Sequence, residues 1–119
     1  MHEVALLTSV VGIVAKTAAE RGAKRVTAVA VQVGDRSGVV PDALVGAWPI
    51  ASADSIAEGA ELIIERIPAA VWCPACNAER EIDEYYALLC PVCESPAGEL
   101  VKGREFLIAY IDLDNIDSS

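Results

Sequence analysis

The sequence contains only one histidine, His2, and its four cysteines are confined to one short segment. It has no nucleophile motif, no glycine-rich phosphate loop and no second histidine that could serve as a general base. Internal repeats and low-complexity segments are absent as well. These absences argue against an enzyme.

Basic residues are also scarce. The chain has 9 lysines and arginines against 18 aspartates and glutamates, which gives a formal net charge of −9. Between residues 70 and 101, six acids stand against one base, Arg80, for a net charge of −5. Such a field repels phosphates and lacks the counterion release that drives binding to DNA and RNA. We therefore expect no nucleic-acid partner.

Long uninterrupted apolar runs are missing too. The first apolar segment is broken by Lys16 and Glu20, and neither a basic region nor a cleavage-like site of small residues marks a secretory signal near Met1. The segment is also too short for a membrane anchor. We expect a cytoplasmic chain, in which thiols stay reduced. The 119 residues, 54% of them hydrophobic, suffice for one small domain with an inserted module.

The cysteines form two C-P-x-C knuckles, Cys73-Pro74-Ala75-Cys76 and Cys90-Pro91-Val92-Cys93, with thirteen residues between them. Proline at the second position of each knuckle narrows the backbone of a tight turn. Two such turns can fold against each other so that four thiolates surround one ion, the arrangement that structural zinc prefers. The spacing therefore predicts a zinc site whose ligands are Cys73, Cys76, Cys90 and Cys93.

Three other readings of the cysteines compete with zinc. A pair of disulfides fits an oxidising compartment better than the cytoplasm. A thioredoxin-like redox motif needs only one knuckle and leaves the second unexplained. Iron in a four-thiolate site remains open, because such a site suits both metals.

Hydrophobic periodicity outlines the rest of the chain. Apolar residues recur at helical spacing from Val4 to Ala18, with Ile13 among those that widen the stripe, and Gly22 follows where a left-handed capping residue is expected. The other expected elements are a strand over 24–33, a helix over 41–48 that Pro49 kinks or ends, and strands over 61–67 and 104–113.

This order predicts an α+β fold: two helices packed on a small three-stranded sheet, with a four-Cys zinc-ribbon module inserted before the last strand. Residues 1–69 plus 102–119 are expected to form the α+β domain, and residues 70–101 the zinc-binding domain. The last residues, from Asn115 on, are expected to fray.

The beginning of the chain offers a second metal chemistry. A free amino terminus followed by histidine can chelate through the Met1 amine, the backbone nitrogen of His2 and its imidazole, and Glu3 can add an oxygen. Nitrogen-rich, nearly planar ligation suits Ni²⁺ or Cu²⁺ better than Zn²⁺. Because a lone terminal histidine is more often a surface residue, the chemistry alone leaves this site open.

Four segments, in this order and spacing, resemble the HypA/HybF family of hydrogenase maturation proteins. They are Met1-His2-Glu3, the segment 57–62 (AEGAEL), the two C-P-x-C knuckles, and the segment 103–108 (GREFLI). The resemblance covers nearly the whole chain. One departure is Glu94, which follows the last cysteine where the family commonly has glycine.

The resemblance implies a non-catalytic nickel metallochaperone for [NiFe]-hydrogenase. It implies Ni(II) as a transient cargo at His2, with the Met1 amine and Glu3 assisting, and a structural Zn(II) on the four cysteines. The implied partners are a nickel-handling GTPase of hydrogenase maturation and the hydrogenase large subunit precursor, with the chain itself a monomer or weak homodimer. The alternative is an acidic zinc-ribbon adaptor that binds only proteins and leaves His2 idle.

Overall fold

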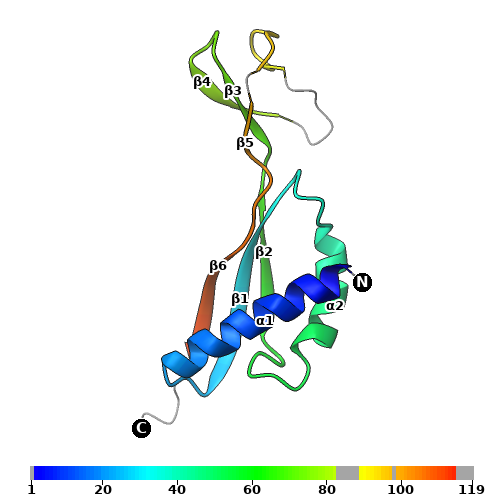
Figure 1. The fold of residues 1–119 in the computed structure, drawn as a ribbon, viewed down its shortest axis with the longest axis vertical. Coiled ribbons are helices and arrows are strands. Elements are labelled where there is room, and N and C mark those ends of the chain that lie inside the picture. The colour runs from blue at the N-terminus through cyan, green and yellow to red at the C-terminus, as the bar shows by residue number, and fades with distance from the viewer. Residues whose placement is uncertain (1, 83–88, 98, 115–119) are drawn as a thin grey trace. The chain divides into compact units, whose positions relative to one another are not determined.

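The computed structural model describes residues 2–82, 89–97 and 99–114, and of His2 only the backbone. The elements, in chain order, are α1 (His2–Glu20), β1 (Arg25–Gly34), α2 (Pro41–Ser52), β2 (Glu61–Ile67), β3 (Ala70–Cys73), β4 (Ala78–Glu81), β5 (Glu99–Lys102) and β6 (Phe106–Asp114) (Figure 1). They confirm the predicted α+β class. Strands β3, β4 and β5 add a second three-stranded sheet that the sequence pattern did not predict.

The chain divides into two compact units. The helical unit comprises the described parts of residues 1–31, 40–65 and 107–119, and the cysteine unit those of residues 32–39 and 66–106. Strands β1, β2 and β6 each begin in one unit and end in the other. The predicted functional domains, 1–69 plus 102–119 and 70–101, stay a prediction.

The first sheet has the strand order β2-β1-β6. Strands β1 and β6 are antiparallel: the N–H of Lys24, just before β1, donates to the carbonyl of Asp114 at the end of β6 (3.0 Å), and the N–H of Gly34 at the end of β1 donates to the carbonyl of Glu105, just before β6 (2.7 Å). Strands β1 and β2 run the same way: Val26 N–H bonds to the Ile56 carbonyl (3.2 Å), and Asp35 N–H bonds to the Ile67 carbonyl (3.0 Å). Parallel neighbours need a long crossover. Here α2 lies in that crossover.

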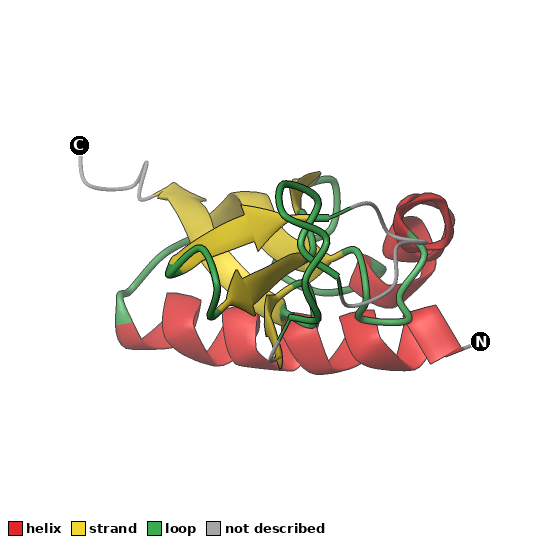
Figure 2. Ribbon diagram, turned by 90° about the horizontal axis from the view of Figure 1, so that it is seen from above, coloured by secondary structure: helices red, strands yellow, loops and turns green. Residues whose placement is uncertain are grey.

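Helix α1 runs across one face of this sheet and contacts α2 (Figures 1 and 2). Its buried residues are Leu7, Val10, Val11, Val14 and Ala18. Ile13 is 57% exposed, so its predicted place in the stripe was wrong. It lies about 100° around the helix from the fully buried Val14, outside the face that meets the sheet. Neither described helix is long and apolar enough to cross a membrane.

Helix α2 does not end at Pro49, as the sequence had suggested it could, but continues to Ser52. Pro49 cannot donate to the carbonyl of Val45, one turn earlier, and both residues are exposed, so that carbonyl can bind water. Two bonds hold the second half of the helix. Ser52 Oγ donates to the Trp48 carbonyl, and the buried Trp48 indole N–H donates to the Ala60 carbonyl, both at 2.8 Å.

Candidate metal centre

The first knuckle forms the turn between β3 and β4. These strands are antiparallel and pair Cys73 with Ala78, so the intervening residues must reverse the chain within four positions. The backbone N–H of Cys76 donates to Cys73 Sγ at 3.3 Å, and Asn77 adopts a left-handed conformation with φ 53°. The turn therefore supplies a backbone hydrogen-bond donor to the Cys73 sulfur.

The second knuckle repeats this geometry from a separate loop. The N–H groups of Val92 and Cys93 both lie 3.4 Å from Cys90 Sγ. The turn is closed by the Glu94 N–H, which bonds to the Cys90 carbonyl at 2.8 Å, and Glu94 has φ 64°. The Cys90 N–H in turn bonds to the Ser95 carbonyl at 2.9 Å. Despite the departure from glycine at position 94, the backbone keeps the left-handed turn.

A small apolar cluster supports the two knuckles. Ala69, Val71 and Ile82 are buried, and Ala97 and Leu100 pack against them. Val71, at the centre of the sheet β4-β3-β5, pairs with both outer strands. Burying one such side chain stabilises a fold by about 1.5 to 3 kcal/mol, so a cluster of this size is a weak core. A structural metal would supply what this core lacks.

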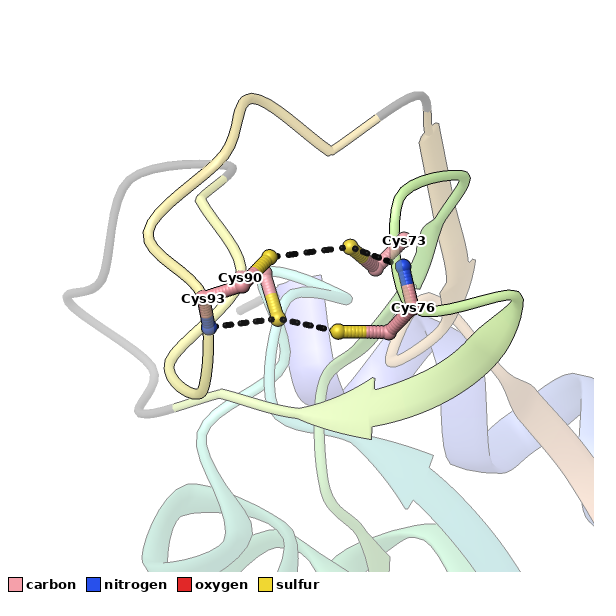
Figure 3. A group of neighbouring side chains, drawn as sticks. All are labelled: Cys73, Cys76, Cys90 and Cys93. Atoms are coloured by element: carbon pink, nitrogen blue, oxygen red, sulfur yellow. Dashed lines mark hydrogen bonds between the residues drawn. The ribbon is translucent and has the colours of Figure 1, made fainter.

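The four thiols converge from the two knuckles on one point (Figure 3). All four sulfurs lie within 4.8 Å of one another, with Cys73 to Cys93 at 3.5 Å and Cys76 to Cys90 at 3.8 Å. A tetrahedron with Zn–S bonds of about 2.3 Å has edges of about 3.8 Å. The donor set and its spacing therefore fit a tetrahedral ion. All four cysteines are free, and the closest of these contacts is far longer than a disulfide bond of about 2.05 Å, so the disulfide alternative is wrong.

The four sulfurs differ in their exposure. Cys73 and Cys90 are fully buried, Cys76 is half-buried and Cys93 is exposed. In each knuckle, the first cysteine therefore lies inside the cysteine unit and the second lies nearer the surface. An ion would have protein behind two of its ligands and solvent beside Cys93.

Without a metal, hydrogen bonds lower the pKa of two of the thiols. Hydrogen bonds from the Ser95 hydroxyl and backbone N–H, followed by contacts with Cys73 and Cys76, lower the pKa of Cys93 to about 6. Burial raises the pKa of Cys90, but the N–H groups of Cys93 and Val92 outweigh it, and the net pKa lies below the ordinary value. Groups in and directly after the second knuckle thus lower the pKa of both thiols.

Cys76 behaves in the opposite way. A hydrogen bond with Arg80 lowers the pKa of Cys76. Hydrogen bonds with Cys93 and Cys73, together with burial, outweigh this effect and raise the pKa to about 11. The metal-free cluster therefore holds a proton on Cys76 near neutral pH. A metal ion must displace that proton, so binding should release it.

The described structure does not test the residues predicted for nickel. Met1 and the side chain of His2 lie outside the described residues. Glu3 is half-buried in the first turn of α1. The predicted nickel site therefore stays a prediction, as does the fraying from Asn115 on, which also lies outside the described residues.

Sequence reasoning missed two residues beside the sulfurs, Arg80 and Ser95. Arg80 contacts Cys76 and Cys90, and Ser95 contacts Cys93. The sequence held one clue, since Arg80 is the only base between residues 70 and 101. Nothing comparable pointed to Ser95.

Residues 1–113 match the model of one protein family, described as "Hydrogenase/urease nickel incorporation, metallochaperone, hypA". Two similar relatives are hydrogenase maturation factors HypA. That of Chloroflexus aurantiacus is 40% identical over 112 residues, which are 94% of this chain and 98% of the relative. That of Geobacter metallireducens is 37% identical over 114 residues, which are 96% of this chain and 100% of the relative.

Two solved structures share the fold. The solution structure of the Ni metallochaperone HypA from Helicobacter pylori has a TM-score of 0.65 and 18% identity, covering 94% of this chain and 97% of that one. A second solution structure, of a HypA protein, has a TM-score of 0.70 and 21% identity, covering 95% and 96%. With residues 1–113 matched and its four sulfurs clustered for a metal, this chain belongs to the HypA family of hydrogenase/urease nickel incorporation metallochaperones.

Proposed function

We propose that this chain is a non-catalytic nickel metallochaperone of [NiFe]-hydrogenase maturation, with a structural zinc on the four cysteines and nickel as a transient cargo at the chain start. The family match over residues 1–113 is the observation that carries the proposal. The four clustered sulfurs support it, because they supply a metal site that is complete without any other residue.

Zinc is the proposed occupant of Cys73, Cys76, Cys90 and Cys93. Four thiolates at tetrahedral spacing suit zinc, which has no redox chemistry and would serve only to hold the two knuckles together. Iron has the same preference for four sulfurs, and its visible absorption distinguishes it from colourless zinc.

Nickel is proposed to bind His2, with the Met1 amine and Glu3 assisting. Because all four cysteines lie in the cluster, a separate cargo must use nitrogen and oxygen donors. Helix α1 begins at His2, and the first N–H groups of a helix have no intrahelical partner that a metal would have to displace. Glu3, in the first turn, supplies a negative charge close to the proposed cation.

The proposed partners are a nickel-handling GTPase and the hydrogenase large subunit precursor, met by a cytoplasmic monomer or weak homodimer. Nickel that is held at His2 can be passed on without unfolding the cysteine unit, which the proposed zinc stabilises. An acidic adaptor that binds only proteins is the second candidate, favoured by the net charge of −9. The two candidates differ in whether a second metal binds.

Deletion of the gene tests the role. The deletion strain should make inactive nickel hydrogenase at low nickel and recover part of the activity in excess nickel. The reason is that a chaperone changes the supply of nickel to the hydrogenase and not the reaction that the hydrogenase catalyses. Complementation with the wild-type gene should restore activity at low nickel, and complementation with His2→Ala should not. Full complementation by His2→Ala would favour the adaptor.

A further inference from the structure

Arg80 lies on the face of the second sheet that carries the metal-binding sulfurs. Strand β4 pairs Arg80 with Val71 and Ala78 with Cys73. Directly paired residues share a face, and residues two apart on a strand do too. Arg80 is therefore on the same face as Cys73, whereas its neighbours Glu79 and Glu81 point to the opposite face and are exposed.

The Arg80 side chain is partly removed from solvent on this face. It is half-buried, and its Nε atom is buried with no hydrogen-bond partner in the described structure. The guanidinium lies beside the sulfurs of Cys76 and Cys90. A guanidinium is always charged, and a charge that leaves water needs an opposite charge nearby. When a metal binds, the sulfurs of Cys76 and Cys90 become thiolates and supply that opposite charge.

We propose that Arg80 is a positioning residue of the metal centre, whose guanidinium holds and charge-balances the metal-bound thiolates of Cys76 and Cys90. The proposal rests on the proposed occupation of the four cysteines by zinc. Four thiolates on one divalent ion carry a formal charge of −2, and the surrounding segment is already acidic. One adjacent guanidinium offsets part of that charge.

The proposal has a chemical consequence that separates the four sulfurs. A hydrogen bond to a metal-bound thiolate draws electron density from the sulfur, so it reacts more slowly with electrophiles and protons. Under the proposal, Arg80 supplies such a bond to Cys76 and Cys90. Cys93 has a neutral partner, Ser95, instead. Loss of Arg80 should therefore make Cys76 and Cys90 more reactive and leave the reactivity of Cys73 and Cys93 unchanged.

Metal competition and cysteine alkylation of the full-length zinc protein test this. In Arg80→Met, zinc affinity against a chromophoric chelator should fall about tenfold, as typical for the loss of an outer partner of a metal ligand. With N-ethylmaleimide as the probe and mass spectrometry as the readout, Cys76 and Cys90 should react faster than in the wild type, and Cys73 and Cys93 at unchanged relative rates. Arg80→Lys, which keeps the charge, should recover part of the affinity.

Lys102→Met is the matched control, because it removes one positive charge from the same unit at a side chain that pairs with Glu79 at 3.1 Å instead of a sulfur. It should leave all four rates unchanged. Arg80→Gln replaces Arg80→Met if the latter does not fold. Unchanged affinity in the Arg80 variants, or a uniform rise at all four cysteines, would overturn the proposal. A wild-type protein without metal on its cysteines would instead overturn the proposed zinc site.

Discussion

Gly34 lies directly against the backbone of Gly103, so that a Cβ added at Gly34 would overlap the carbonyl group of Gly103. Two hydrogen bonds fix this crossing: Gly34 N–H to the Glu105 carbonyl at 2.7 Å, and Arg36 N–H to the Gly103 carbonyl at 2.6 Å. Gly103 itself has φ 119°, a conformation open to glycine. The close approach explains why glycine stands at both positions.

Gly34→Ala should therefore lower the free energy of unfolding by about 2 to 3 kcal/mol, because backbone atoms cannot move aside as a flexible side chain can. Urea denaturation followed by circular dichroism measures the change. Gly12→Ala is the control. Its Cβ would meet nothing within 4 Å in α1, so it should stabilise the protein by about 0.5 to 1 kcal/mol. Equal effects of Gly34→Ala and Gly12→Ala on the free energy of unfolding would show that the backbone at Gly34 does not lie as close to Gly103 as described.

Glu94→Gly should stabilise the second knuckle. Glu94 has φ 64°, which costs a residue with a Cβ about 1 to 2 kcal/mol, and the flexibility of glycine in the unfolded chain cancels part of the gain. We expect a net increase of about 0.5 to 1 kcal/mol in the free energy of unfolding, and slower zinc loss to a chelator.

Asn77→Gly gives the comparison at the equivalent position of the first knuckle. Asn77 has φ 53°, but asparagine tolerates this region better, so its gain should be smaller. A loss of stability in Glu94→Gly would mean that the Glu94 side chain makes a contribution larger than the strain.

In the metal-free, reduced protein, Cys93 should be the first cysteine that iodoacetamide modifies at pH 7. Its pKa of about 6, lowered by Ser95, leaves it mostly thiolate, whereas Cys76, with a pKa of about 11, stays protonated. Ser95→Ala should slow the reaction of Cys93 at pH 7 and move its midpoint to higher pH.

The same shift sets the direction of a pH effect on stability. A thiol whose pKa is lowered on folding stabilises the metal-free fold above its ordinary pKa of 9.0, and this contribution disappears as the pH falls through about 6. Alkylation of Cys76 before Cys93 at pH 7 would contradict the arrangement of Ser95 and the sulfurs.

Much of the fold could be predicted because long periodic segments dominate their own structure. Apolar residues recur at helical spacing along α1, and valine stands at every second position from Val29 to Val33 in β1; both elements formed within a few residues of the expected bounds. Pro49 was misleading, because a local rule about proline cannot include the indole bond from Trp48 to Ala60 that holds the helix beyond it. Tertiary contacts decide such positions.

The second sheet was missed for a related reason. Each of its strands has only four residues, too few for a period to emerge. The cysteine spacing predicted the cluster of four sulfurs, because spacing alone limits how two knuckles can meet. It could not predict Arg80 as their neighbour, since this depends on the register of β3 against β4.

The count of metals in untagged, zinc-loaded protein after equilibrium dialysis against Ni²⁺ tests the central claim most directly. The account predicts that zinc stays on the four cysteines and that one nickel per chain binds in addition. This nickel should be lost in His2→Ala and when two residues are added before Met1, because the addition converts the chelating amine into an amide. Cysteine variants should lose zinc but keep the nickel if they remain folded. No nickel in the wild type, or nickel bound only where zinc has been displaced, would contradict the account.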